Sequence, residues 1–151
     1  MPACTFFGHR NCPRAIDDRL IAVLENLITQ HKVDMFYVGN HGGFDSAVHR
    51  ALIQMHVKYP HIDYAIVLAY MPTQQTSLDM SHTLFPEEIA MAHPRFAISK
   101  RNDWMLQQAN YVIAYITHQS GGAAQFVRKA YRQNKPVIPL ADSELRVPYE
   151  V

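Results

Sequence analysis

Charge of either sign is scarce in this 151-residue chain, and the two signs almost cancel. Charged residues make up 18% of it, and 14 Lys and Arg stand against 13 Asp and Glu, a formal net charge of +1 at pH 7. Proteins dedicated to nucleic acid normally carry a basic excess, so we do not expect nucleic acid as a partner. Hydrophobic residues make up 48%, a proportion typical of globular proteins that excludes disordered and collagen-like chains.

Cysteine and long apolar runs are scarce as well. Cys4 and Cys12 are the only cysteines and form no Cys-x-x-Cys motif, so we expect no disulfide scaffold and a reduced, cytoplasmic location. The longest apolar stretch, residues 64–71, spans eight residues and is too short to cross a membrane. The first residues contain no basic region of the kind that begins a signal peptide. We therefore expect no membrane partner.

Strand and helix patterns alternate along the chain. Five continuous apolar runs predict β-strands at residues 4–7, 35–38, 64–70, 111–116 and 137–140. Amphipathic patterns predict helices between them at residues 16–28, 44–55, 99–109 and 122–134. Continuous rather than alternating apolar strands are typical of a parallel sheet buried on both faces. The sequence thus predicts an α/β fold, organised as one domain over residues 1–151.

One segment, residues 71–98, lacks a regular pattern. It contains Pro72, Pro86 and Pro94 and is too long for an ordinary connection in a compact domain. We expect a functional flap or a hidden short helix, which the sequence from Pro86 to Ile89 could begin.

Glycine is the third scarcity, and its placement is informative. All six glycines follow predicted strands: Gly8, then Gly39, Gly42 and Gly43, then Gly121 and Gly122. Parallel strands end at one edge of the sheet, where ligands of α/β proteins bind and glycine lets backbone N–H groups approach them. Tight turns alone also require glycine, but the concentration at one edge favours a site. Neither a GxGxxG nor a P-loop motif is present, so a standard dinucleotide or P-loop fold is not supported.

Two predicted helices begin directly after paired glycines and differ in charge. The helix after Gly43 carries Asp45 in its first turn, and this carboxylate would repel phosphate but could accept hydrogen bonds from ribose. The helix after Gly122 has no acid in its first turn, and Thr117 and Ser120 precede it. This second start is the better phosphate cradle, with Arg10 as a possible counter-charge.

Three histidines follow the same strands, namely His9, His41 and His118. Three imidazoles at one edge are compatible with zinc, but their spacing matches no metal motif. We therefore expect no metal and assign these side chains to hydrogen bonds with a ligand or with the loops.

The order of these motifs resembles the SLOG superfamily, a Rossmann-like group that includes the LOG phosphoribohydrolases and the DNA-processing protein DprA. The likeness rests on Gly8-His9-Arg10, Gly42-Gly43-Phe44-Asp45, Arg101-Asn102 and Gly121-Gly122, and it is nearest to small single-domain members. The resemblance implies a three-layer Rossmann-like fold with a five-stranded parallel sheet in the order 3-2-1-4-5. It also implies a nucleotide-derived ligand. The predicted binding residues are Gly8, His9, Arg10, Gly39, Gly42, Gly43, Asp45, Arg101, Asn102, Thr117, Ser120, Gly121 and Gly122.

LOG enzymes pair an Arg at a helix start with a Glu after the glycine loop to cleave an N-glycosidic bond. Arg101 matches the first, but Arg128 stands where the resemblance places the Glu. A cation cannot stabilise the developing positive sugar, so LOG-type hydrolysis is not expected.

Three hypotheses of function follow. The first is cofactor-free binding or sensing of ADP-ribose, NAD or a nucleoside phosphate by a homo-oligomer. The second is an N-glycosidic hydrolase or transferase in which Arg101 acts with another acid; Asp45 is the best placed candidate, and Asp79, Glu87 and Glu88 are the others. The third, a DprA-like single-strand DNA binder, is not expected because no basic run contains interleaved aromatics. Tyr70 and Trp104 could stack on a base, although core packing is the expected role of Trp104.

Overall fold

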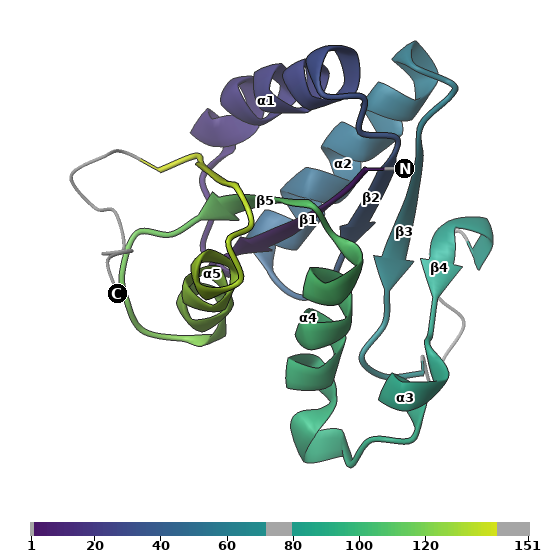
Figure 1. Cartoon of the computed structure of the whole chain (residues 1–151), viewed down its shortest axis with the longest axis vertical. Coiled ribbons are helices and arrows are strands. Elements are labelled where there is room, and N and C mark those ends of the chain that lie inside the picture. The colour runs from purple at the N-terminus through teal and green to yellow at the C-terminus, as the bar shows by residue number, and fades with distance from the viewer. Residues whose placement is uncertain (1, 72–79, 142–151) are drawn as a thin grey trace.

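The computed structural model describes residues 2–71 and 80–141. They form an α/β fold with a six-stranded, entirely parallel sheet in the order β4-β3-β2-β1-β5-β6 (Figure 1). The strands are β1 (Ala3–Gly8), β2 (Met35–Val38), β3 (Asp63–Val67), β4 (Thr83–Leu84), β5 (Tyr111–Tyr115) and β6 (Val137–Pro139). The helices are α1 (Asp17–Gln30), α2 (Gly43–Lys58), α3 (Glu87–Ala90), α4 (Ala97–Gln108) and α5 (Gly122–Arg132). Short 3-10 turns lie at Arg14–Ile16, Met80–His82 and Pro94–Phe96.

The five expected strands are all present, and their order of 3-2-1-4-5 is confirmed. The expectation of five strands in total is corrected by β4, which pairs with β3 at the edge of the sheet. This sixth strand comes from the segment 71–98, and its two residues are too few to give a periodic pattern. The same segment contains α3, the short helix expected after Pro86. Asp79 lies outside the described residues.

Side chains of the central strand β1 alternate between two apolar layers. Cys4 and Phe6 pack in the layer with α1 and α2, and the ring of Phe6 stacks on Phe36 at 6.2 Å between centroids. Phe7 points to the other face, where it stacks on Phe126 of α5 at 5.6 Å and packs with α4. The alternation of a fully buried strand therefore produces the three-layer arrangement.

The direction of strand addition reverses beside β1. The chain adds β2, β3 and β4 on one side of β1 and then β5 and β6 on the other. The loops after β1 and β5 consequently lie side by side, and the His9 backbone N–H donates to the Tyr115 carbonyl at 3.3 Å. Such a switch point is where ligands bind in open α/β sheets. No helix within residues 2–71 and 80–141 is long and apolar enough to cross a membrane.

Candidate functional site

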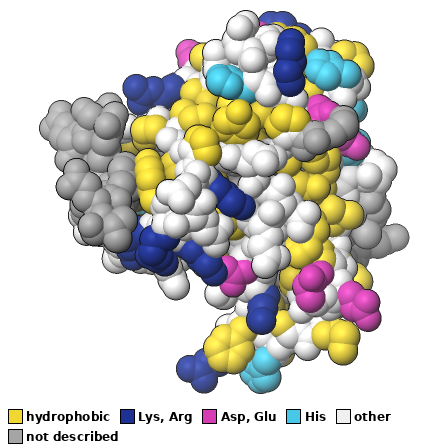
Figure 2. All heavy atoms as spheres, in the orientation of Figure 1, with side chains coloured by type: hydrophobic (Ala, Val, Ile, Leu, Met, Phe, Trp, Pro, Cys, Tyr) yellow, Lys and Arg dark blue, Asp and Glu magenta, His cyan; other side chains and the backbone are white. Residues whose placement is uncertain are grey.

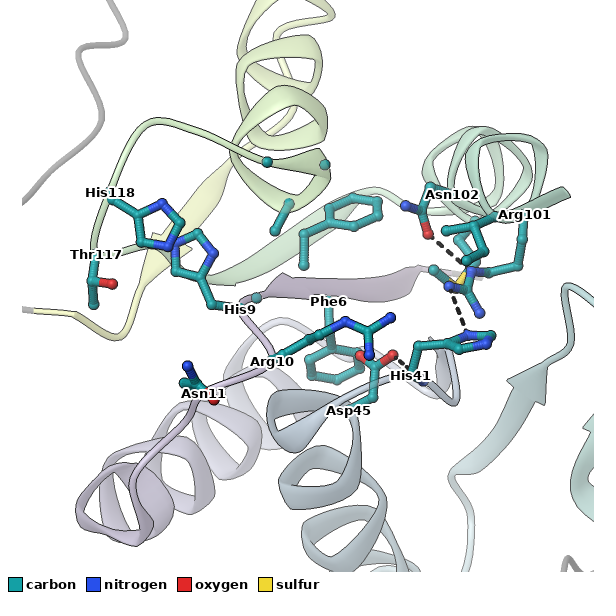
Figure 3. Close-up of a pocket in the computed structure, with 17 residues that line it drawn as sticks. Phe6, His9, Arg10, Asn11, His41, Asp45, Arg101, Asn102, Thr117 and His118 are labelled. Carbon is teal, nitrogen blue, oxygen red and sulfur yellow. Dashed lines mark hydrogen bonds between the residues drawn. The ribbon is translucent and has the colours of Figure 1, made fainter. Parts of the chain in front are cut away.

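A cavity of about 530 Å³ lies at this switch point, at the carboxyl edge of the sheet (Figure 3). Its walls come from the ends of β1 and β5, the starts of α2 and α5, and one face of α4. The lining residues are Phe6, Phe7, Gly8, His9, Arg10, Asn11, His41, Asp45, Ile98, Arg101, Asn102, Met105, Thr117, His118, Gly121, Gly122 and Ala123. A volume of this size is in the usual range for small-molecule sites.

The start of α5 opens into the cavity. Gly121 has φ +94°, a conformation that side chains rarely adopt, and it turns the chain from the loop into the helix. A Cβ added at Gly121 or Gly122 would meet no atom within 4 Å, so this backbone is accessible. The first turn holds no acid, and no described residue outside the helix accepts a hydrogen bond from the backbone N–H of Gly122 or Ala123. Unsatisfied N–H groups at the positive end of a helix dipole favour an anion.

The loop before α5 is held by side chains of the chain itself. Arg128 donates to the Gln119 carbonyl at 3.1 Å, and the hydroxyl of Ser120 lies 3.0 Å from Nδ1 of His118. Neither Arg128 nor Ser120 lines the cavity. Arg128, which replaces the Glu that the resemblance would place there, thus supports the loop instead of facing a ligand.

Two imidazole rings stack at this end of the cavity. The rings of His9 and His118 are nearly parallel, with centroids 3.7 Å apart. Burial, and repulsion by His118, lower the pKa of His9. Nε2 of His9 is buried and has no hydrogen-bond partner among the described residues. A buried nitrogen without a partner costs free energy, so a polar group of a ligand would stabilise it.

Arg101 forms the opposite wall, and only 3% of its surface is exposed. Its Nε donates to the Asn102 side-chain oxygen at 2.9 Å, and its Nη1 donates to the Val67 carbonyl at 3.2 Å. Nη2 lies 3.5 Å from Nδ1 of His41. All three partners are neutral, and no carboxylate of a described residue lies within 4.0 Å of the guanidinium. A buried cation without a contacting anion is costly, and the cavity gives an anion access to it.

Asp45 lies near Arg101 without forming an ion pair. One oxygen accepts a hydrogen bond from the His41 backbone N–H at 3.0 Å. Burial raises the pKa of Asp45 to about 6, and the hydrogen bond from His41 and the charge of Arg101 only partly oppose this shift. Figure 3 shows the Arg10 guanidinium extending towards Asp45, away from the start of α5. A carboxyl group that titrates close to neutral pH can accept or release a proton.

The glycines between the end of β2 and the start of α2 allow protein atoms to pack closely against the backbone. The N–H of Gly43 donates to the Arg10 carbonyl at 2.7 Å, and a Cβ at Gly43 would lie 2.4 Å from that oxygen. A Cβ at Gly39 would lie 2.6 Å from Nη1 of Arg101 and 2.8 Å from the Asp45 carboxylate. Glycine at position 39 is thus what lets these two charged side chains approach each other.

The structure brings most of the expected binding residues to one cavity. Those that line it are Gly8, His9, Arg10, Asp45, Arg101, Asn102, Thr117, Gly121 and Gly122. The expected residues that do not line it are Gly39, Gly42, Gly43 and Ser120. The three glycines lie against Arg10, Arg101 or Asp45, which do line it. Glu87 and Glu88 are exposed on α3 and do not line the cavity, and Trp104 packs edge-on against Tyr37 as expected of a core residue.

Six lining residues are not among those expected from the sequence: Phe6, Phe7, Asn11, Ile98, Met105 and Ala123. Ile98 and Met105 lie three residues before and four after Arg101, so helical spacing could have identified them. Asn11 follows Arg10 directly and carried no signal of its own. No group of three His, Cys, Asp or Glu side chains able to hold a metal occurs within the described part of the chain.

No model of a known protein family matches the chain, and no curated protein matches it. Solved structures do match. DNA processing protein A (DprA) from Streptococcus pneumoniae superposes with a TM-score of 0.68 over 96% of this chain at 16% identity. DprA from Helicobacter pylori, described for its single-stranded DNA binding mode, superposes with a TM-score of 0.62 over 91% of this chain at 12% identity. This chain spans 52% and 64% of those two chains, respectively.

These likenesses show that the chain has the DprA-like Rossmann fold, and they support the SLOG resemblance at the level of the fold. They also correct one expectation. The near-neutral charge led us not to expect nucleic acid, yet a protein with this fold, H. pylori DprA, binds single-stranded DNA. Net charge was therefore the wrong criterion, because binding depends on the local potential of a surface and this chain could concentrate its cations locally.

Proposed function

We propose that this protein binds a nucleoside phosphate, either free or as part of a single-stranded nucleic acid, in the cavity at the end of β1. The phosphate lies against the N-terminus of α5, and a second acceptor group of the ligand faces Arg101. ADP-ribose and NAD share this chemistry and belong to the same proposal. Binding of this kind needs no separate cofactor.

The observation that carries the proposal is the buried guanidinium of Arg101. Its contacts are neutral, and it faces a cavity that could hold a small ligand. The accessible N–H groups of Gly122 and Ala123 add a second position that favours negative charge. Two anion-favouring positions on opposite walls of one cavity suit a ligand with a phosphate at one end and a polar base or second phosphate at the other.

Isothermal titration calorimetry would test the proposal with nucleoside monophosphates, ADP-ribose, NAD and a dT hexamer. We expect at least one to bind with Kd below about 1 mM, equivalent to about −4.1 kcal/mol, and Arg101→Met to weaken that binding about 100-fold. Arg132→Met removes an exposed arginine from the far end of α5 and is the control. Binding by no member of the panel, or equal binding by wild type and Arg101→Met, would contradict the proposal.

A second candidate function, cleavage of an N-glycosidic bond, is favoured by Asp45. With a pKa of about 6, this carboxyl group can be protonated near neutral pH and give its proton to a leaving base. Water would then take the place of the base on the sugar carbon and release a proton. The test is release of free base from nucleoside monophosphates: turnover that Asp45→Asn removes would support the reaction, and absence of turnover by wild type would exclude it for those substrates.

We also propose a cytoplasmic location, which the two unpaired cysteines Cys4 and Cys12 support. The homo-oligomer expected from the sequence stays a prediction, which sedimentation velocity would test.

A further inference from the structure

Two imidazole rings face each other in the wall of the cavity that lies opposite Arg101. His9 follows β1 and His118 follows β5, and both side chains line the cavity. Their rings are stacked, with centroids 3.7 Å apart and planes inclined by 10°. Figure 3 shows the two rings face to face, with Arg101 on the other side of the cavity, while Figure 2 shows the charged and histidine side chains of one face of the molecule. A ligand in the cavity therefore lies beside both rings.

The two rings differ in their surroundings. His9 is half-buried, and its Nε2 is buried without a hydrogen-bond partner among the described residues. His118 is exposed, and its Nδ1 lies 3.0 Å from the hydroxyl of Ser120. Burial and then repulsion by His118 lower the pKa of His9, and a hydrogen bond with the His118 backbone only partly opposes this shift. The pair therefore takes up its first proton at His118 and leaves His9 neutral.

Other charges have little part in this difference between the rings. The other charged or titratable residues that line the cavity are Arg10, His41, Asp45 and Arg101. No carboxylate of a described residue lies within 4.0 Å of His9 or His118, and Tyr115 of β5 meets the His9 ring edge-on at 6.4 Å. Burial and the neighbouring imidazole are thus the causes that distinguish His9 from His118.

Two titratable groups whose pKa values are pushed apart can serve as the acid and the base of one reaction. A neutral imidazole accepts a proton at its bare nitrogen, and a protonated imidazole beside it donates one. Transfer of a phosphoryl group between two oxygens needs both, because one oxygen loses a proton while the other gains one. The accessible N–H groups at the start of α5 line the same cavity, and Gly122 is four residues after His118.

We infer that His9 and His118 are the general base and the general acid for cleavage of a ribonucleotide phosphodiester bound at the start of α5. The inference rests on the proposed function and selects a ribose-containing diester as the substrate. Nε2 of His9 takes the proton of the ribose 2′-hydroxyl, and the 2′-oxygen forms a bond to phosphorus. The bond from phosphorus to the 5′-oxygen of the next nucleoside breaks, and this oxygen takes a proton from His118.

The products of this step are a 2′,3′-cyclic phosphate and a free 5′-hydroxyl group. His9 then carries the proton that His118 has lost, and exchange with water restores the starting state of the pair. Negative charge that builds on the phosphoryl oxygens is stabilised by the N–H groups of Gly122 and Ala123. The reaction differs from cleavage of an N-glycosidic bond, because the base stays attached to its sugar.

The test uses the full chain and the dinucleotide UpU, with TpT, which lacks the 2′-hydroxyl, as the matched control substrate. We expect wild type to convert UpU into uridine 2′,3′-cyclic phosphate and uridine and to leave TpT intact, as followed by ³¹P NMR. His9→Asn and His118→Asn should each lower kcat about 100-fold or more, since general acid–base catalysis contributes about 10²–10⁴. KM should change less than about tenfold, because the start of α5 and Arg101 remain.

A third histidine provides the control for loss of an imidazole. His31 is exposed at the end of α1 and does not line the cavity, so His31→Asn should cleave UpU as wild type does. A nuclease carried through purification would act equally in all three variants.

The pH profile distinguishes proton transfer from a structural role of the rings. The dependence of kcat/KM on pH should be bell-shaped in wild type, because cleavage needs His9 neutral and His118 protonated. The remaining activity of His9→Asn should lose the fall at low pH, and that of His118→Asn should lose the fall at high pH. Lower activity with the shape of the wild-type profile in both variants would overturn the inference.

The outcomes separate the two proposals. Binding of UpU without cleavage, or cleavage that either Asn variant retains in full, overturns the acid–base pair while the binding proposal stands. Loss of cleavage in both variants, with TpT affinity kept within about tenfold, supports the pair. If neither UpU nor TpT binds wild type, the acid–base pair fails together with its premise.

Discussion

Helices α2 and α5 begin with nearly the same backbone conformation but lie in different surroundings. Each begins at the second glycine of a pair whose first member adopts nearly the same conformation, φ +95° and ψ 177° at Gly42 and φ +94° and ψ 171° at Gly121. At α2 other groups of the protein occupy the helix start. The Arg10 carbonyl accepts a hydrogen bond from the Gly43 N–H, and Asp45 places negative charge in the first turn. At α5 no described residue outside the helix accepts from the Gly122 N–H, and a Cβ at Gly122 would meet no atom within 4 Å.

A glycine pair at a helix start therefore does not by itself identify a binding position. The same turn geometry serves packing when protein atoms fill the helix start and favours an anion when they do not. At α2 the residue that fills the helix start is Arg10, which belongs to the loop after β1 and is distant in sequence from α2.

The largest effect is expected from a methyl group added to the glycine pair of α2, compared with one added to the pair of α5. Gly43→Ala would place Cβ 2.4 Å from the Arg10 carbonyl oxygen, so the turn must shift, and we expect a loss of about 2–3 kcal/mol of unfolding free energy. Gly122→Ala adds its Cβ to open space within a helix and should be neutral or stabilising by up to about 1 kcal/mol. Urea unfolding of both variants measures the contrast, and equal losses would show that the two helix starts are not different.

Charge removal at Arg101 should affect binding more than folding. Arg101→Met takes away a buried cation whose partners are neutral, so we expect ligand affinity to fall by about 100-fold, near 2.7 kcal/mol. Arg101→Lys keeps the charge without the planar fork and should recover only part of the affinity. Calorimetry measures both affinities, and thermal unfolding confirms that the variants are folded. Unchanged affinity in Arg101→Met would show that this side chain does not contribute to ligand binding.

The pH dependence of binding should follow Asp45. Because its pKa is raised to about 6, the carboxylate gains a proton as pH falls through that value and stops repelling an anionic ligand. A diester ligand such as the dinucleotide TpT, which does not titrate in this range, should bind about three- to tenfold more tightly at pH 5.5 than at pH 7.5. Asp45→Asn should bind at pH 7.5 as wild type binds at pH 5.5, and an unchanged pH profile in this variant would exclude Asp45 as the cause.

The same shift links Asp45 to stability. The folded state binds the Asp45 proton more tightly than the unfolded state, whose pKa stays near 3.8, so this contribution to stability is complete below about pH 4 and is lost as pH rises through 6. Urea unfolding between pH 4 and 7 should show a smaller decline in Asp45→Asn than in wild type.

The smallest effect is expected at the paired imidazoles. His118→Asn removes the ring that stacks on His9, which should weaken binding by less than about tenfold, since the helix start and Arg101 remain. The pKa of His9 should rise in this variant, because repulsion by His118 is one cause of its lowering. NMR titration of the His9 ring protons measures the shift, and an unchanged pKa would leave burial as the sole cause.

Much of the fold could be predicted because its signals are local. Continuous apolar runs identified the central strands, and α/β alternation followed from them. The strand order came only from the resemblance, since periodicity contains no information on which strands are neighbours. Strand β4 was missed because two residues give no period. Helix α4 begins at Ala97, two residues before the predicted start at residue 99, and directly follows the 3-10 turn Pro94–Phe96, which His93 caps by accepting from the Arg95 N–H.

Less of the candidate site could be predicted, because its properties depend on contacts across the fold. The sequence favoured the acid-free start of α5 over that of α2 as the phosphate position, and this stays a prediction; a Cβ at Gly122 would meet no atom within 4 Å. It placed Arg10 as a counter-charge for α5, but Figure 3 shows this side chain extending towards Asp45. The burial of Arg101 among neutral partners could not be predicted, since it depends on how α4 packs against β3 and against the loop that precedes α2.

The most direct test of the central claim is an NMR titration of the ¹⁵N-labelled protein with dTMP, following the backbone amides of both helix starts. We expect Gly122 and Ala123 to show the largest shift changes and to approach saturation with one dissociation constant, because their N–H groups donate to the phosphate. Gly43, whose N–H already donates to the Arg10 carbonyl, should change little. Larger changes at Gly43 than at Gly122, or no saturable change at either, would show that the phosphate does not bind at the start of α5.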